Sequence, residues 1–250
     1  MGIGEALARE FTTQGAQVVM LSRDQGRLDA ARVRIARPEQ TLALTCDVRH
    51  REDIDRVVAL TMHHFRKIDI WINNAGHGLL DSAASVNMAD VRETFETNLF
   101  ATLESMQAVL PLMRQSKSGT IINISSVAGH IPIPFHGVYS ATKFAMNALG
   151  KAARIELAGT GINLMTVCPG YVKTEFSANA LRGTEAKRVR PKSARGISPE
   201  RVARAVLNGY VKSKREVIVP WTMIPVVKLY QLFPGLVERA MTKMAQGTAE

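Results

Sequence analysis

The sequence predicts an α/β protein with a Rossmann-like, doubly wound parallel sheet in a three-layer α/β/α arrangement. Short apolar runs alternate with stretches of helical periodicity along most of the 250 residues, which is the order of repeated βαβ units. The apolar runs are continuous, as in strands that are covered on both faces. A third observation modifies the prediction, because the first helix has no strand before it.

The expected strands lie, in order, at residues 16–21, 41–46, 68–73, 119–125, 162–168 and 216–220, where short apolar runs occur. The expected helices lie at residues 5–11, 24–36, 51–65, 90–113, 138–157 and 199–212. The helix at 51–65 has one apolar side, formed by Ile54, Val57 and Val58. The helix at 24–36 is ended by Pro38.

The opening helix needs a preceding strand to complete a first βαβ unit. In this fold that strand lies at the centre of the sheet, beside the topological switch point. Its absence would leave a slot between buried strands, with unpaired backbone groups facing the slot. The sequence therefore predicts that an upstream segment is missing, either because the true start lies upstream or because this form is truncated.

The composition is that of an ordinary globular protein, with 46% hydrophobic and 22% charged residues. A chain of this length can bury a large core without disulfides or metals. Cys46 and Cys168 form no CxxC pair, so we expect core cysteines in a reducing compartment such as the cytoplasm, and no metal site. We expect one domain over residues 1–219 and an apolar, basic extension over residues 220–250.

The net charge of +10 is compatible with a nucleic acid, a membrane surface or a phosphorylated ligand. Six cations fall between Arg182 and Arg195, against the single acid Glu185. No aromatic residue lies between them to stack on bases, so we expect a solvated loop and no nucleic-acid partner.

Tyr139 and Lys143 are four residues apart at the start of an expected helix, which places them on one face. A free tyrosine has a pKa of about 10, and a nearby ammonium lowers it. A tyrosine tuned in this way can give a proton to a carbonyl oxygen or take one from an alcohol. Taken alone, this common pair favours an interfacial tyrosine and a surface lysine.

Polar and glycine-containing motifs follow several of the strands. Ser126 comes after the strand at 119–125, thirteen residues before Tyr139, and its hydroxyl can donate to the same substrate oxygen. The run Asn73–Gly76 follows another strand, and its glycine lets the backbone approach a ligand closely. The run Cys168–Thr174 begins at the end of the strand at 162–168, so all three motifs fall on the ligand-binding edge of the sheet.

These motifs together resemble those of the short-chain dehydrogenase/reductase family, from Gly2 to about Val219. The resemblance implies an oxidoreductase that moves a hydride between a nicotinamide cofactor and an alcohol or carbonyl substrate. It implies that Tyr139 is the catalytic acid/base and that Lys143 holds the nicotinamide ribose and lowers the tyrosine pKa. Ser126 would polarise the substrate oxygen, with Ser125 as a weaker candidate, and Asn98 would position a water in the proton relay.

The resemblance also assigns cofactor contacts. Gly2, Ile3 and Gly4 would be the surviving half of the pyrophosphate loop, whose threonine and first glycine are absent here. The adenosine side would be lined by Asp47, Val48, Asn74, Ala75 and Gly76, and the nicotinamide side by Pro169, Gly170, Val172 and Thr174.

The end of the expected strand at residues 16–21 favours NADP(H) over NAD(H). An acid there would bind the ribose 2′-hydroxyl of NAD, but Ser22 occupies that position and Arg23 follows it. A serine and an arginine suit a 2′-phosphate. Asp24 is the counterargument, because a register error of one residue would bring it to the ribose.

The resemblance places a mobile substrate lid at about residues 175–195. In the extension, Pro220, Pro225, Pro234 and Lys228 make a poor transmembrane span. The extension could instead lie on a membrane surface, cover the substrate pocket or contact a subunit, and each case suits a hydrophobic or lipid-like substrate. The family implies a homodimer or homotetramer. The alternatives to an enzyme are a non-catalytic relative, favoured by the missing strand, and a basic nucleic-acid or membrane-surface binder.

Overall fold

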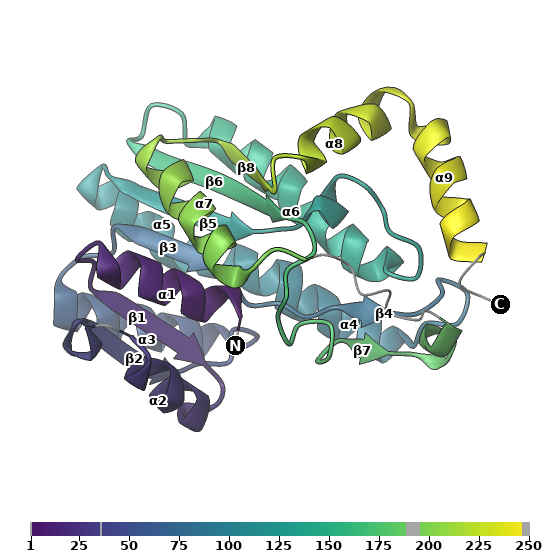
Figure 1. The fold of residues 1–250 in the computed structure, drawn as a ribbon. Coiled ribbons are helices and arrows are strands. Elements are labelled where there is room, and N and C mark those ends of the chain that lie inside the picture. The colour runs from purple at the N-terminus through teal and green to yellow at the C-terminus, as the bar shows by residue number, and fades with distance from the viewer. Residues whose placement is uncertain (1, 36, 189–195, 247–250) are drawn as a thin grey trace.

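Parallel strands form the middle layer of the structure, with helices on both faces (Figure 1). The computed structural model describes residues 2–35, 37–188 and 196–246. Four strands pair in the order β3 (Ile70–Asn73), β5 (Gly119–Ile124), β6 (Ile162–Pro169) and β8 (Glu216–Val219). A separate parallel pair is formed by β1 (Val18–Ser22) and β2 (Thr41–Thr45). The predicted fold class is confirmed.

The two faces of the sheet carry different helices. One face is covered by α1 (Ile3–Thr13) and α7 (Pro199–Val211), which pack against each other. The other face is covered by α3 (Arg51–Phe65), α5 (Ala101–Ser116) and α6 (Gly137–Glu156). The helix α2 (Gln25–Val33) packs beside β1 and β2.

Neighbouring residues of the central strands enter opposite cores. Ile122 of β5 and Met165 of β6 pack in the core beneath α1 and α7. Ile121 and Leu164, one position earlier in each strand, pack in the core beneath α3, α5 and α6. Because side chains alternate across a strand, both faces need apolar residues, which explains the continuous apolar runs.

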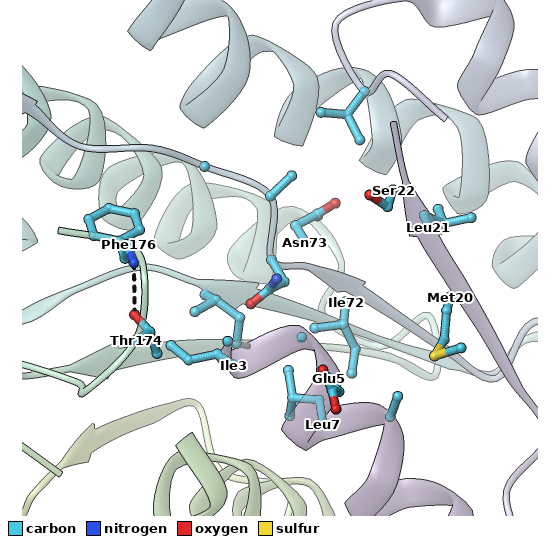
Figure 2. Close-up of a pocket in the computed structure, with 18 of the residues that line it drawn as sticks. Ile3, Glu5, Leu7, Met20, Leu21, Ser22, Ile72, Asn73, Thr174 and Phe176 are labelled. Atoms are coloured by element: carbon cyan, nitrogen blue, oxygen red, sulfur yellow. Dashed lines mark hydrogen bonds between the residues drawn. The ribbon is translucent and has the colours of Figure 1, made fainter. Parts of the chain in front are cut away.

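A slot separates β1 from β3. In the described part of the chain, β1 pairs only with β2 and β3 pairs only with β5. Residues of both strands, such as Met20 and Ile72, line one continuous cavity together with Leu7 of α1 (Figure 2). Within the described residues, the edges of β1 and β3 that face each other are therefore unpaired.

Two features differ from the expected elements. The helix expected over residues 90–113 is divided into α4 (Met88–Phe95), a π-helical segment over Glu96–Phe100 and α5. A short parallel pair, β4 (Leu79–Leu80) and β7 (Leu181–Arg182), was not expected, because two-residue strands leave no periodic pattern.

The extension is helical, with α8 (Met223–Leu232) and α9 (Pro234–Gln246) at one edge of the molecule (Figure 1). Pro225 and Pro234 fall in the first turns of these helices, where a backbone N–H has no helical partner and proline is tolerated. Val227 of α8 packs against Val127 and Ile131. Within the described residues, none of the helices is both long enough and apolar enough to cross a membrane.

Candidate active site

A cavity of about 1790 Å³ lies at the carboxyl ends of β1, β3, β5 and β6 and continues into the slot. Figure 2 shows side chains of α1, β1 and β3 on one side, with Thr174 and Phe176 on the other. The cavity is lined by every cofactor-contact residue that the sequence analysis names: Gly2, Ile3, Gly4, Ser22, Arg23, Asp47, Val48, Asn74, Ala75, Gly76, Pro169, Gly170, Val172 and Thr174. Ser126, Tyr139 and Lys143 line it too.

The N-terminus of α1 faces this cavity. Gly2 precedes the helix and no side chain caps its first turn, so the first N–H groups can bind an anion. A Cβ on Gly4 would lie 2.8 Å from Asn74 Nδ2. Glycine at this position therefore allows α1 to lie close to the end of β3.

Tyr139, Lys143 and Ser126 meet because α6 begins beside the end of β5. Lys143 Nζ lies 5.8 Å from the centre of the Tyr139 ring and donates a 3.0 Å hydrogen bond to the Ile124 carbonyl. Ser126 lines the same cavity, and its hydroxyl donates a 3.4 Å hydrogen bond to the Pro169 carbonyl. The Ser126 hydroxyl also accepts a 3.0 Å hydrogen bond from the Ala128 N–H, which fixes the serine at the strand end.

Burial is the largest cause of the pKa shifts of Tyr139 and Lys143. It raises the pKa of Tyr139 to about 12, against a smaller lowering by the Ser126 hydrogen bond. It lowers the pKa of Lys143 to about 8. The expected lowering of the tyrosine pKa is therefore absent here, because loss of solvent outweighs any stabilisation of the phenolate. At neutral pH the structure has a protonated tyrosine beside a lysine that is still largely charged.

Asn98 lies behind the cavity, in the π-helical segment, and is fully buried. Its Oδ1 accepts from the His77 N–H at 2.9 Å, and its Nδ2 donates to the His77 carbonyl at 3.0 Å and to Thr142 Oγ1 at 3.2 Å. A Cβ on Gly76 would lie 2.9 Å from Asn98 Oδ1 and 3.7 Å from Lys143 Nζ. Asn98 thus fixes the chain that follows β3 next to the catalytic lysine candidate.

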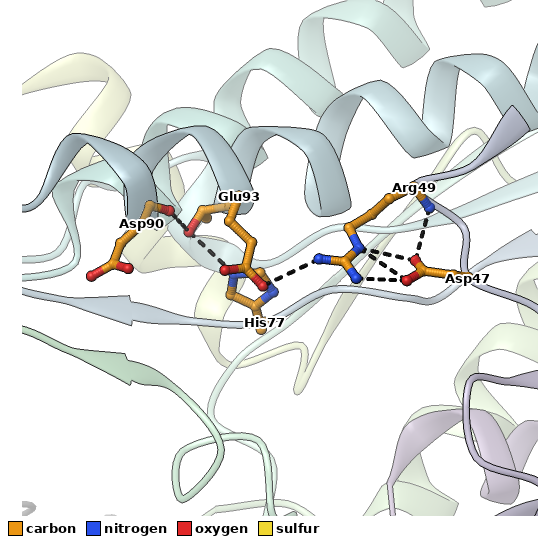
Figure 3. Close-up of polar contacts among 6 residues, drawn as sticks. Asp47, Arg49, His77, Asp90 and Glu93 are labelled. Carbon is orange, nitrogen blue, oxygen red and sulfur yellow. Dashed lines mark hydrogen bonds and ion pairs between the residues drawn. The ribbon is translucent and has the colours of Figure 1, made fainter.

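Two polar residues of the cavity wall, Arg49 and His77, were not anticipated from the sequence. Arg49 lies between Asp47 and Glu93 (Figure 3), with an ion pair of 2.6 Å to Asp47 and one of 3.5 Å to Glu93. The Arg49 hydrogen bond is the main reason that the pKa of Asp47 falls to about 2. The Asp47 carboxylate is therefore ionised and already paired at the adenosine side of the predicted site.

Asp24, the residue that counted against NADP(H), has a structural role. Its carboxylate accepts a 3.0 Å hydrogen bond from the Arg27 N–H and caps α2. Ser22 and the exposed Arg23 line the cavity, as does Arg27. The end of β1 and the first turn of α2 therefore bring Ser22, Arg23 and Arg27 to the cavity wall, and the Asp24 carboxylate caps the helix and lies 3.8 Å from the Arg27 guanidinium.

The expected lid begins against the catalytic tyrosine candidate. The Phe176 ring lies edge-on to the Tyr139 ring, with 5.6 Å between centroids. Arg182 donates a 3.0 Å hydrogen bond to the Ser177 carbonyl and belongs to β7. Residues 189–195, which include the basic residues Arg190, Lys192 and Arg195, lie outside the described residues.

A parallel sheet with a cavity at its carboxyl edge, beside an uncapped helix N-terminus, defines a Rossmann-type nucleotide-binding protein. The short chain dehydrogenase family profile matches residues 1–185. The chain belongs to this family and hence to the NAD(P)-binding oxidoreductases.

Particular relatives cover most of the chain. The ketoacyl reductase HetN of Nostoc sp. is 36% identical over 219 residues, which are 87% of this chain and 75% of the relative. A short-chain dehydrogenase from Streptomyces avermitilis has a TM-score of 0.85 at 25% identity, covering 99% of this chain and 94% of that one. A serine dehydrogenase solved with NADP+ has a TM-score of 0.76 at 30% identity, covering 87% and 90%.

Proposed function

We propose that the protein is an NADP(H)-dependent oxidoreductase that interconverts an alcohol and a carbonyl compound. The observation that carries this proposal is the meeting of Ser126, Tyr139 and Lys143 in one cavity. The bound nicotinamide supplies or accepts the hydride. The protein binds and orients the substrate and moves the proton.

In the direction of reduction, Tyr139 donates its hydroxyl proton to the substrate oxygen. A pKa of about 12 keeps this hydroxyl protonated at neutral pH. Ser126, which lines the same cavity, donates to the same oxygen and polarises the carbonyl. Lys143 supplies positive charge beside the phenolate that remains after the transfer.

The direct test is turnover of NADPH with a panel of hydrophobic ketones and aldehydes, followed by the loss of reduced-nicotinamide absorbance. We expect turnover with NADPH and less with NADH. A cofactor at a hundred times its Kd stabilises a protein by about 2.7 kcal/mol, so thermal melting measures binding separately. A protein that NADPH stabilises but that reduces no carbonyl and oxidises no alcohol would be the non-catalytic binding relative.

The preference for NADP(H) is proposed from Ser22, Arg23 and Arg27 at the end of β1. Similar solved structures hold NADP in the serine dehydrogenase and ElxO and NAD in a Burkholderia phymatum enzyme, so they support a nicotinamide cofactor without choosing between the two.

Ser22→Asp should reverse the preference, because a carboxylate binds a ribose 2′-hydroxyl and repels a 2′-phosphate. We expect the ratio of the Kd for NADPH to that for NADH to rise at least about tenfold, equivalent to about 1.4 kcal/mol. Ser22→Asn, of similar size but uncharged, is the matched control and should change the ratio much less. An unchanged ratio in Ser22→Asp would place the 2′-position elsewhere.

A hydrophobic or lipid-like substrate is proposed from the wall nearest Tyr139. Phe176, Val127, Ile133 and Met223 of α8 line the cavity, so the extension helps to build this wall. Trp221, Leu232 and Phe233 of the extension remain exposed, and contact with a membrane surface or with a subunit stays a prediction. Family membership favours a homodimer or homotetramer, and two buried free cysteines suit the cytoplasm.

A further inference from the structure

A cluster of three metal-ligand side chains lies on the α6 side of the sheet. The His130 cluster consists of His130, Cys168 of β6 and Glu216 of β8. Thr166 is the β6 residue opposite Glu216, and Cys168 lies two positions further along the same strand. Both side chains therefore point to one face, where His130 meets them.

The spacing of the three ligand atoms suits a small divalent ion. His130 Nε2 lies 3.4 Å from Cys168 Sγ and 3.3 Å from Glu216 Oε1. Zinc bond lengths and a tetrahedral angle require about 3.6 Å between nitrogen and sulfur and about 3.3 Å between nitrogen and oxygen. All three atoms lie within 4.8 Å of one another, so a small movement of the Glu216 or Cys168 side chain completes the triangle.

Asn147 of α6 borders the cluster, with its Nδ2 3.5 Å from His130 Nε2. Its Nδ2 donates a 2.8 Å hydrogen bond to the Gly129 carbonyl, and its Oδ1 lies 4.0 Å from Cys168 Sγ. A closed set of four protein ligands is typical of structural zinc. The four residues come from α6, β6, β8 and the turn after Ser126, so an ion here would tie these elements together behind the cavity.

Charge and softness narrow the choice of ion. A thiolate and a carboxylate together balance the charge of a dication. A thiolate ligand selects zinc-class metals over magnesium and calcium. His130 and Cys168 are buried and the Glu216 side chain is 34% exposed, which gives an ion one route of entry.

We propose that His130, Cys168, Glu216 and Asn147 bind one zinc-class divalent ion as a structural site. When the ion binds, the Cys168 S–H bond breaks, its proton leaves to solvent and a metal–sulfur bond forms. This proposal differs from the sequence-based expectation of no metal site. Sequence spacing could not show it, because His130 and Cys168 are 38 residues apart.

The test uses the full chain, stripped with a chelator and titrated with Co²⁺, whose thiolate complexes absorb in the near ultraviolet. We expect this charge-transfer band to saturate at about one equivalent and to disappear when Zn²⁺ displaces Co²⁺. Cys168→Ser should lose the band. Cys46→Ser, which changes the other buried cysteine, is the matched control and should keep it.

Two further measurements show whether a variant loses the metal because its site is changed or because it fails to fold. Zn²⁺ should raise the melting temperature of the unmutated chain and of Cys46→Ser, but not that of Cys168→Ser. Glu216→Gln, at the exposed edge of the cluster, should weaken Co²⁺ binding at least about tenfold without loss of the cooperative melt. The proposal is overturned by the absence of the band in the unmutated chain, by its survival in Cys168→Ser, or by unchanged affinity in Glu216→Gln.

Discussion

Tyr139→Phe should remove at least about 99% of turnover, since a positioned general acid contributes about 10²–10⁴ in rate. The change deletes one hydroxyl, which is the proton donor of the proposed reaction. The ring remains, so its contact with Phe176 and the walls of the cavity are kept. The free energy of unfolding should therefore change by no more than about 1 kcal/mol.

The measurement is kcat for an accepted ketone, together with the Kd for NADPH and the melting temperature. Tyr171→Phe makes the same chemical change in a second tyrosine of the cavity wall, which is half exposed, and should retain most of the activity. A Tyr139→Phe protein that reduces the ketone at a rate near that of the unmutated chain would refute the assigned role. Weak NADPH binding by this variant would instead assign the hydroxyl to cofactor binding.

The strands and the edge that carries the site follow from local sequence signals. Continuous apolar runs predict β5 and β6, because both of their faces are buried. The residues at strand ends, such as Ser22 and Ser126, reach one cavity because parallel strands direct their carboxyl ends to one edge. The family resemblance then gives candidate roles to residues that topology has brought together.

The features that the sequence did not predict depend on contacts between residues that are far apart along the chain. The π-helical segment at Asn98 accompanies hydrogen bonds to His77 and Thr142, 21 and 44 residues away along the chain. The protonated state of Tyr139 depends on burial, which the spacing of Tyr139 and Lys143 does not reveal. The pairing of Arg49 with Asp47 and Glu93 likewise requires α4 to lie beside the end of β2.

Lys143→Met should abolish turnover and stabilise the fold. The ammonium is buried, and its pKa falls from 10.5 to about 8, which corresponds to a destabilisation of about 3 kcal/mol at neutral pH. Loss of the hydrogen bond to the Ile124 carbonyl offsets about 1 kcal/mol of the gain. At pH 7 we therefore expect the variant to have the higher free energy of unfolding, by about 2 kcal/mol.

The pH dependence of stability shows whether Lys143→Met is stabilised by removal of a buried charge or by better packing of methionine. Below pH 8 the lysine is charged in both the folded and the unfolded chain, and the full cost of burying it is present. Between pH 8 and 10.5 the folded chain loses the proton first, so the unmutated protein gains stability and the advantage of Lys143→Met shrinks. Tyr139 is present in both proteins, so its contribution to the pH dependence largely cancels when their free energies of unfolding are subtracted.

Urea unfolding of both proteins between pH 7 and 10.5 measures this difference, with Lys214→Met as a control that removes an exposed lysine. An advantage that stays constant with pH would show that methionine merely packs better. A variant less stable than the unmutated chain at pH 7 would mean that the hydrogen bond to Ile124 outweighs desolvation. The expected result would show that burial of the Lys143 charge lowers the stability of the fold. A residue that costs stability in this way is kept where its charge is needed for function.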